Sequence, residues 1–232
     1  MELEGKRAIV LGGTSGIGLA VSKQLVANGA RVTAASRTAN RAVAENVAVR
    51  PVDVLNRAAL EQLFKELSPF DILVNAATGG GRATGPFLAM DLDAFEGSFR
   101  KLWGYVNSVR LGAPFMSQRG AIVLISGSPA RKAMPGMSAI STVGNAVEGF
   151  VRAIAPELAP RRINVVAPGV IDTPMFAATG EQREAFFKQA TQRNAIARAG
   201  TADEVAEAVL FLLRNEFTTG TTVDVDGGAL LP

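Results

Sequence analysis

The sequence predicts an α/β fold: a doubly wound, seven-stranded and mostly parallel sheet with helices on both faces. Three observations predict it. Short β-branched runs alternate with helical patterns along the chain. The run at 121–125 is continuously apolar, which is typical of a strand buried on both faces. A glycine-rich turn at 12–18 joins the first apolar run to the first helical pattern. Strands and helices that alternate in this way form parallel sheets.

Each element follows from its local pattern. Strands are expected at 8–11, 31–35, 47–52, 71–74, 121–126, 163–167 and 221–225. Helices are expected at 16–28, near 57–67, from 91 to about 111, and at 138–158, 181–193 and 202–213. Gly29 fits the position that follows a helix, and Asp91 fits an N-cap. Pro156 is expected to bend the long helix or to mark its end. No repeat or linker interrupts residues 1–232, so we expect one domain.

Charge and hydropathy limit the kinds of partner. Of the 232 residues 48% are hydrophobic, which is enough for one sizeable core. Lysine and arginine number 24 and acidic residues 21, and the charges are interspersed. We therefore expect neither nucleic acid nor a membrane surface as a partner. No apolar run is long enough to span a bilayer, and the acidic start at 1–4 does not resemble a signal peptide.

The scarcity of some residue types limits the chemistry. Cysteine is absent, which excludes disulfides and thiolate nucleophiles and makes the cytoplasm the expected location. Histidine, the commonest general base, is absent as well. Tyr105 is the one tyrosine. Acid–base chemistry must therefore use lysine, carboxylates, serine or Tyr105.

The turn at 12–18 is built to receive a phosphate. Unpaired N–H groups and the positive dipole end of the following helix both favour an anion there. Glycine lets the backbone approach such a ligand closely. The spacing is G-x-x-x-G-x-G and not G-x-G-x-x-G, so a merely tight turn is the alternative.

Residues that follow the next strands favour a dinucleotide with an extra phosphate. Ser36, Arg37 and Thr38 follow the second strand, where an acidic residue would bind a ribose 2′-hydroxyl and an arginine suits a 2′-phosphate. Arg37 therefore favours NADP(H) over NAD(H), with a solvated surface arginine as the alternative. Asp53, after the third strand, is expected to accept a hydrogen bond from the adenine amino group, or else to cap a helix. Asn75 follows the fourth strand, where the backbone meets a ribose.

Several motifs together resemble those of the short-chain dehydrogenase/reductase family along nearly the whole chain. The run 12–18 is similar to the family's glycine motif, and Asp53-Val54 to its adenine-side motif. The runs 75–78, 162–175 and 224–228 resemble its Asn-Asn-Ala-Gly motif, its nicotinamide-side segment and its C-terminal signature. The resemblance implies a single dinucleotide-binding Rossmann domain over 1–232, the cofactor NADP(H), and a homodimer or homotetramer. The residues expected to bind the cofactor are Gly12, Thr14, Ser15, Gly16, Ile17, Ser36, Arg37, Thr38, Asp53, Val54, Asn75, Ala76, Ala77, Pro168, Gly169, Val170, Ile171 and Thr173.

The chain departs from the family at the catalytic positions. The family uses a serine after the fifth strand and Tyr-x-x-x-Lys on the long helix, where the lysine lowers the phenol pKa. A gapless alignment over 120–159 places Gly127 at the serine, Ile140 at the tyrosine and Gly144 at the lysine. The resemblance therefore implies a divergent member, whose acid–base groups lie elsewhere.

Four sets of side chains are possible substitutes. Lys101 falls at or beside the family's asparagine position and forms an i, i+4 pair with Tyr105, so it is our candidate acid or base. Ser126 and Ser128 flank Gly127 and are candidates for a substrate contact, with a turn role as the alternative. Ser138 and Ser141 suit capping of the long helix. Arg131 and Lys132 would suit an anionic substrate, or form a solvated loop. The run 79–82, three glycines followed by Arg82, is expected to form a mobile loop that is a lid or only a flexible connection.

Three functions remain open. The first is an NADP(H)-dependent oxidoreductase with non-standard catalytic residues that acts on a small carbonyl, alcohol or imine. The second is a non-catalytic NADP(H)-binding protein, a sensor or assembly partner that kept the fold. The third is a cofactor-independent elimination or isomerisation at the same place.

Overall fold

The apolar runs of the sequence form the strands of one parallel sheet. The computed structural model describes residues 1–38 and 43–232. The seven strands lie in the order β3-β2-β1-β4-β5-β6-β9, and every pair is parallel. Their bounds are β1 Arg7–Leu11, β2 Arg31–Ser36, β3 Val47–Pro51, β4 Phe70–Asn75, β5 Met116–Ile125, β6 Arg162–Pro168 and β9 Thr222–Val225. The predicted doubly wound α/β fold is confirmed.

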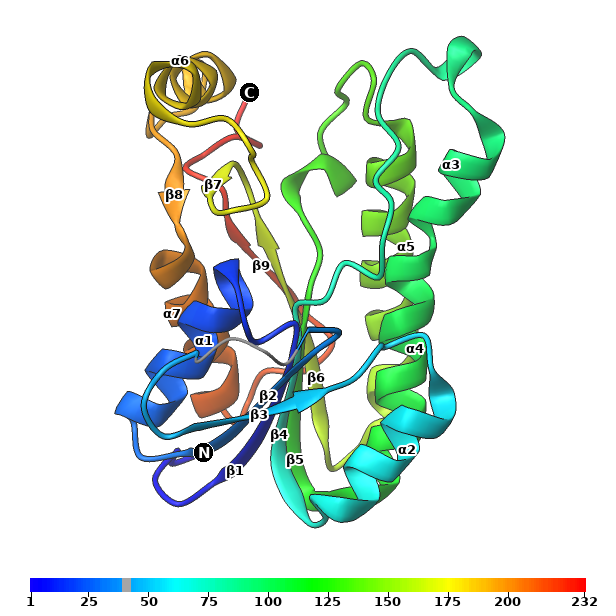
Figure 1. Cartoon of the computed structure of the whole chain (residues 1–232), viewed down its shortest axis with the longest axis vertical. Coiled ribbons are helices and arrows are strands. Elements are labelled where there is room, and N and C mark those ends of the chain that lie inside the picture. The colour runs from blue at the N-terminus through cyan, green and yellow to red at the C-terminus, as the bar shows by residue number, and fades with distance from the viewer. Residues whose placement is uncertain (39–42) are drawn as a thin grey trace.

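Helices cover both faces of this sheet (Figure 1). On one face lie α1 (Gly16–Ala27) and α7 (Ala202–Arg214), and on the other α2 (Arg57–Glu66), α4 (Arg100–Gly112) and α5 (Ser138–Leu158). Because side chains alternate along a strand, Val10 of β1 joins the first core and Ile9 the second. Burying each such side chain stabilises the fold by about 1.5–3 kcal/mol.

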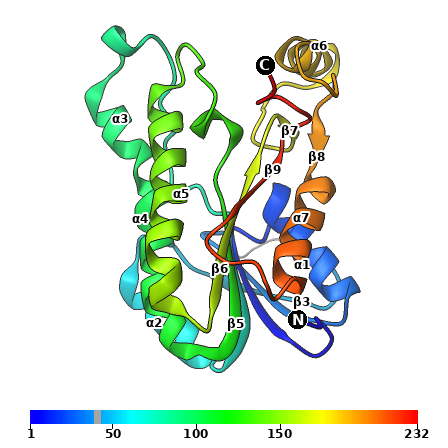
Figure 2. The ribbon, with the colours of Figure 1, turned by 180° about the vertical axis from the view of Figure 1, so that it is seen from behind.

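The carboxyl ends of the strands meet at one edge of the sheet. Two more helices, α3 (Leu92–Ser98) and α6 (Gly180–Thr191), lie beyond this edge, on opposite sides in both views (Figures 1 and 2). A small parallel pair that the sequence analysis missed, β7 (Ile171–Asp172) and β8 (Gly200–Thr201), supports α6. The loops between β4 and α3 and between β7 and α6 therefore lie at the edge where ligands of open parallel sheets bind.

The helix predicted from 91 to about 111 is two helices, so this prediction is wrong in one respect. The Asp91 side chain caps α3, as predicted, by accepting a hydrogen bond from the Ala94 N–H at 2.7 Å. The break follows Ser98, whose hydroxyl donates to the Ala94 carbonyl and accepts from the Ala83 N–H. A serine bonded back to the preceding turn bends a helix, and here it also ties α3 to the loop that leaves β4.

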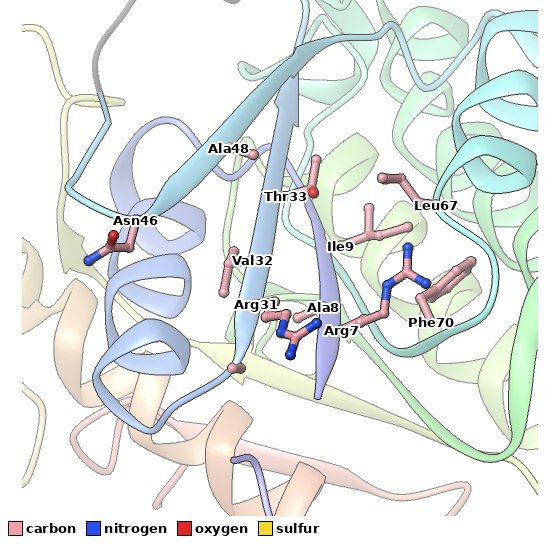
Figure 3. A pocket seen from close by; sticks show the side chains of 11 residues that line it. Arg7, Ala8, Ile9, Arg31, Val32, Thr33, Asn46, Ala48, Leu67 and Phe70 are labelled. Atoms are coloured by element: carbon pink, nitrogen blue, oxygen red, sulfur yellow. The ribbon is translucent and has the colours of Figure 1, made fainter. Parts of the chain in front are cut away.

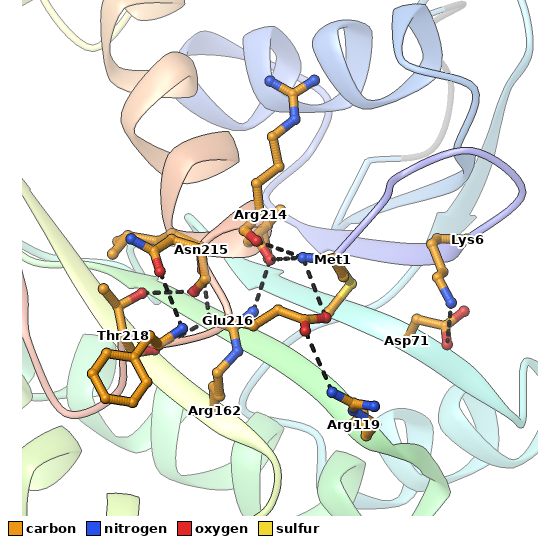
Figure 4. A network of polar contacts seen from close by, with 12 residues as sticks. Met1, Lys6, Asp71, Arg119, Arg162, Arg214, Asn215, Glu216 and Thr218 are labelled. Carbon is orange, nitrogen blue, oxygen red and sulfur yellow. Dashed lines mark hydrogen bonds and ion pairs between the residues drawn. The ribbon is translucent and has the colours of Figure 1, made fainter.

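A polar network secures the opposite edge of the sheet (Figure 4). The buried Arg162 guanidinium donates to the carbonyls of Leu212 and Leu213, both at 2.7 Å, and of Thr218 at 3.1 Å. The Met1 ammonium donates to the carbonyls of Leu213 and Arg214. Two positive groups thus satisfy the unpaired carbonyls at the negative end of α7.

Among the described residues, no helix is both long and apolar enough for a membrane crossing. The same residues hold no cluster of three or more histidine, cysteine, aspartate or glutamate side chains that would suit a metal ion.

Candidate functional site

The glycine turn is packed so closely that larger residues do not fit. A Cβ on Gly12, whose φ is +75°, would lie 2.7 Å from the Ala77 nitrogen. A Cβ on Gly18 would lie 2.2 Å from the Gly12 carbonyl oxygen. The buried Ser22 hydroxyl lies within hydrogen-bond distance of the carbonyls of Gly13 and Gly18, at 3.2 and 2.9 Å. The glycines thus press α1 against the turn and bring the ends of β1 and β4 together.

The amino end of α1 is left open toward a ligand. Its N-cap, Ser15, forms no side-chain cap bond, and no acidic residue lies in the first turn. Gly16 has a φ of +50°, and a Cβ there would lie 3.5 Å from Thr173. The amino end of α1 therefore presents its N–H groups beside the segment that follows β6, at Thr14, Ser15, Gly16 and Ile17. Such a group of N–H donors suits a pyrophosphate.

The end of β2 carries an exposed guanidinium. The Ser36 hydroxyl donates to the Thr38 carbonyl at 2.9 Å and stabilises the turn after the strand. Arg37 lies in this turn and is exposed. Among the described residues it forms no ion pair, so its charge is available to a phosphate.

The end of β3 settles the alternative for Asp53. Asn56 caps α2, since its side chain accepts a hydrogen bond from the Ala59 N–H at 3.1 Å, so a capping role for Asp53 is wrong. Asp53 instead accepts from the Leu55 N–H at 2.9 Å, which leaves its second carboxylate oxygen for other partners. Val54 is buried against Gly104 of α4.

Asn75 organises the end of β4 from within the core. Its buried side chain donates to the Ser108 hydroxyl at 2.9 Å and accepts from the Ala77 N–H at 3.0 Å. The Ala76 N–H donates to the Leu11 carbonyl at 2.9 Å. These bonds hold the backbone of Ala76 and Ala77 against Gly12. The Asn75 amide forms its hydrogen bonds with the protein and not with a ligand.

The segment after β6 is held from both sides. A Cβ on Gly169 would lie 2.8 Å from Asp226, and the Gly169 N–H donates to the Val225 carbonyl at 2.9 Å. The Val170 carbonyl accepts from the Gly200 N–H at 2.9 Å. Pro168, Val170, Ile171 and Thr173 therefore run on from β6 beside α1. The carboxylate of Asp226 accepts N–H bonds from Gly228 and Leu230 and forms the turn of the C-terminal signature.

The catalytic positions named by the resemblance differ in how much room they leave. A Cβ on Gly127 would meet nothing closer than Pro129 Cδ at 3.5 Å, and the backbone there is extended. A Cβ on Gly144 would lie 2.8 Å from Ala130 Cβ. Ile140 is half-buried on the first turn of α5. Position 127 is thus open, whereas the loop after β5 fills the space beside position 144.

Lys101 brings an amine to the end of β5. Its Nζ donates to the Ser126 carbonyl at 3.1 Å and lies 5.7 Å from the centre of the Tyr105 ring. Burial, and secondly the charge of Arg82, lowers the pKa of Lys101 to about 7. The ammonium therefore binds the residue that precedes Gly127, and it can exchange a proton near neutral pH.

Tyr105 faces the core. Its hydroxyl donates to the Ile125 carbonyl at 2.8 Å, and burial raises the pKa of the phenol. A phenol that is buried and hydrogen-bonded in this way is a packing residue of the core and offers no proton to a ligand.

The serine and cationic candidates are already engaged. The Ser126 hydroxyl points to α5, 3.2 Å from both the Gly144 carbonyl and the buried Glu148 carboxylate. Arg131 pairs with Glu148 at 3.4 Å and with Asp224. The Lys132 ammonium donates to the Ala229 carbonyl at 2.5 Å. These contacts favour a structural role for all three side chains.

Two arginines beyond the carboxyl edge were given no ligand role by the sequence analysis. Arg183 donates to the Asp172 carboxylate and to the carbonyls of Thr173, Phe176 and Ala178, and thereby holds the loop 172–180. A pocket of about 570 Å³ lies in this loop. Arg82, in the loop between β4 and α3, contacts the Met175 sulfur. The contact of Arg82 joins loops far apart in the chain, so no local sequence pattern predicts it.

A second cavity lies away from this site (Figure 3). It measures about 330 Å³ and is lined by the amino ends of β1 and β2, including Arg7 and Arg31, and by Leu67 and Phe70. The glycine turn, by contrast, follows the carboxyl end of β1.

Comparison with known proteins agrees with this geometry. A family model described as "Enoyl-(Acyl carrier protein) reductase" matches residues 12–229. L-xylulose reductase of Bos taurus is 34% identical over 244 residues, covering 99% of this chain and 98% of the relative. The short-chain dehydrogenase/reductase ATR9 of Stachybotrys chlorohalonatus is 32% identical over 252 residues, with 99% and 98% covered.

The structural comparison extends this to the whole fold. A crystal structure of a small-chain dehydrogenase in complex with NADPH superposes with a TM-score of 0.84 at 29% identity, over 99% of this chain and 100% of that one. A family model that spans the glycine turn and the C-terminal signature, and relatives that cover the chain end to end, lead to one conclusion: the chain belongs to the short-chain dehydrogenase/reductase family.

Proposed function

We propose that this protein is an NADP(H)-dependent oxidoreductase that acts on a small carbonyl, alcohol or imine with non-standard catalytic residues. The relatives named above are a reductase and a dehydrogenase/reductase, and a similar structure was solved in complex with NADPH. The single observation that carries the proposal is the Lys101 amine, with a pKa of about 7, beside the open position 127.

The residues present fit the cofactor. Gly12 lets the turn pack directly against Ala77 at the end of β4, and α1, whose N-cap forms no side-chain bond, offers N–H groups to a pyrophosphate. Arg37 supplies the charge for a 2′-phosphate, and the free oxygen of Asp53 suits an amino group of adenine. When bound, NADPH supplies the reducing equivalent, and the chain's own residues bind, orient and protonate the substrate.

Lys101 is the proton donor in this proposal. A protonated amine near neutral pH can give its proton to a carbonyl oxygen or an imine nitrogen as charge develops there. The Ser126 carbonyl holds the amine in place through the 3.1 Å hydrogen bond. Gly127 leaves room for the substrate beside it. The predicted substrate contact of the Ser126 hydroxyl stays a prediction, and its present bonds favour a structural role.

The test is NADPH consumption by purified protein with a panel of carbonyls and cyclic imines. The Lys101→Met variant, which keeps the length of the side chain but has no proton to give, is expected to lose about 10²–10⁴-fold in kcat and to keep its NADPH affinity. Lys132→Met is the matched control and should retain kcat. Turnover that survives in Lys101→Met would exclude this role for the lysine.

A second candidate is a non-catalytic NADP(H)-binding protein. It is favoured by Ala130, which fills the space beside Gly144, so that a lysine has no place there. This candidate predicts tight NADPH binding and no turnover with any member of the panel. An activity that falls in Lys101→Met without a loss of binding would rule it out.

The remaining expectations concern assembly and location. We propose a homodimer or homotetramer, because three large apolar side chains are exposed in and before α3 and α4. Leu88 lies before α3, Leu92 begins α3 and Trp103 lies in α4, and they are 98%, 77% and 54% exposed. Light scattering of the purified protein measures this, and a monomer at micromolar concentration would contradict it. The cytoplasmic location and the single domain over 1–232 stay predictions.

A further inference from the structure

The cationic side chains around the carboxyl edge differ in what they already bind. All five N–H groups of Arg183 have acceptors in the loop 172–180. Arg131 is paired with Glu148 and Asp224, and Lys132 donates to the Ala229 carbonyl. Arg183 thus has no N–H left for a ligand, and the charges of Arg131 and Lys132 are already held by acceptors of the protein.

Arg82 is the exception. Among the described residues it pairs with no carboxylate, and the polar contact of its guanidinium is with the Met175 sulfur. A thioether is a weak acceptor, so this contact satisfies little of a guanidinium's hydrogen-bonding capacity. Arg82 spans from the β4–α3 loop to the loop after β7, which lie on opposite sides beyond the sheet edge (Figures 1 and 2).

The loop that carries Arg82 is anchored on both sides of it. Before it, Gly79 has a φ of +70°, and a Cβ there would lie 2.6 Å from the Arg100 carbonyl oxygen and 2.9 Å from the Lys101 nitrogen. After it, the buried Ala83 donates its N–H to the Ser98 hydroxyl at 2.9 Å. The backbone at Arg82 is thus fixed against the start of α4, next to Lys101.

We propose that Arg82 binds a carboxylate of the substrate, so that the reducible group is the carbonyl of a 2-oxo acid or the C=N of a carboxylated imine. The inference rests on the proposed oxidoreductase function and names its substrate class. A carboxylate adjacent to the reacting carbon accepts two parallel N–H bonds from a guanidinium, which also fixes its orientation. The carbonyl oxygen or imine nitrogen then lies on the side of Lys101.

The positive charge of Arg82 also favours binding of an anion beside Lys101. Arg82 and Lys101 are both basic, and the positive charge of Arg82 disfavours a second one on the amine. A bound carboxylate offsets this repulsion and keeps the Lys101 amine protonated when the substrate arrives. A neutral substrate leaves the repulsion in place.

The experiment compares matched substrates that differ by the carboxylate. Phenylpyruvate is paired with phenylacetone, and 1-pyrroline-2-carboxylate with 2-methyl-1-pyrroline, each with NADPH. The wild-type kcat/KM is expected to be at least about tenfold higher for each carboxylate. Arg82→Ala should remove this preference, Arg82→Lys should restore part of it, and Arg152→Ala, an exposed arginine of α5, should leave it unchanged.

Binding is measured as well, by calorimetry of phenylpyruvate and phenylacetone with NADP⁺-loaded protein. Turnover without a carboxylate preference overturns the role of Arg82 and leaves the oxidoreductase function standing. Carboxylate binding that is lost in Arg82→Ala, without turnover of any substrate, supports Arg82 and overturns the oxidoreductase function. Wild-type protein that neither binds nor reduces a carboxylate better than its neutral partner overturns the proposal, as does a preference that persists in Arg82→Ala.

Discussion

At the scale of single residues, the chemistry depends on what surrounds each side chain and not on its type alone. Lys101 and Lys132 are both lysines beside the same edge of the sheet. Lys101 is half-buried, and desolvation together with the charge of Arg82 lowers its pKa to about 7, whereas Lys132 donates to a carbonyl on the C-terminal segment. The pKa of Lys101 suits acid–base chemistry at neutral pH.

The pH dependence of reduction follows from this. Lys101 must be protonated to donate, and its pKa is about 7. We therefore expect kcat/KM for reduction, which reports the pKa of the free enzyme, to be level below this pH and to fall about tenfold per pH unit above it. The oxidation direction, which needs the neutral amine, should show the opposite slope. Steady-state rates from pH 5.5 to 9 in both directions, all of them about constant, would contradict the assignment.

Two glycines on neighbouring elements provide a matched pair of substitutions. Gly127→Ala adds a Cβ with nothing closer than 3.5 Å, and its extended backbone suits alanine, so the stability should stay equal or rise by up to about 1 kcal/mol. Gly144→Ala places a Cβ 2.8 Å from Ala130, and overpacking should cost about 1–3 kcal/mol. Urea unfolding of both variants measures the difference. Equal midpoints would contradict the expected overpacking and would show that the loop after β5 moves away from position 144 at little cost.

At the scale of elements, polar side chains determine where helices begin, break and end. Asp91 begins α3, Ser98 ends it early, and Arg162 satisfies the last carbonyls of α7. The start at Asp91 was predictable because an N-cap acts within its own turn. The break at Ser98 and the role of Arg162 were not, since both depend on partners brought by the fold.

The buried Arg162 should contribute more to stability than the exposed ion pairs of the same network. Arg162→Leu leaves buried carbonyls of α7 without donors, and we expect a loss of about 3 kcal/mol in the free energy of unfolding. Arg119→Leu is the control from the same network (Figure 4), because its ion pair with Glu216 is exposed and should be worth less than about 1 kcal/mol. Denaturant titrations compare the two, and similar losses would refute this account of Arg162.

At the scale of the whole molecule, the site exists because parallel strands end together. β1, β2 and β4 deliver the glycine turn, Arg37 and Asn75 to one edge, although these residues are far apart in the chain. A ligand that spans these strands binds the folded chain and not the unfolded one, so it stabilises the whole molecule.

This linkage tests the 2′-phosphate role of Arg37. At 100 times its Kd a cofactor stabilises the fold by about 2.7 kcal/mol, seen as a higher Tm. In Arg37→Ala the Tm increase from NADPH should shrink strongly, while that from NADH, tested at the same concentration, should change little. Equal effects on the two cofactors would exclude a specific contact with the 2′-phosphate.

By itself the sequence determined the α/β class, the seven strands and the residues that follow each strand, because hydrophobic periodicity and glycine turns act over a few neighbouring residues. It also named Lys101, because no histidine and one tyrosine leave few groups for proton transfer. The tertiary structure alone decided which candidates are free. Ser126 and Arg131 are bound to Glu148 on α5, while Arg82 contacts Met175 and, within the described part of the chain, pairs with no carboxylate. Burial and pairing arise between segments distant in the chain, so no local pattern encodes them.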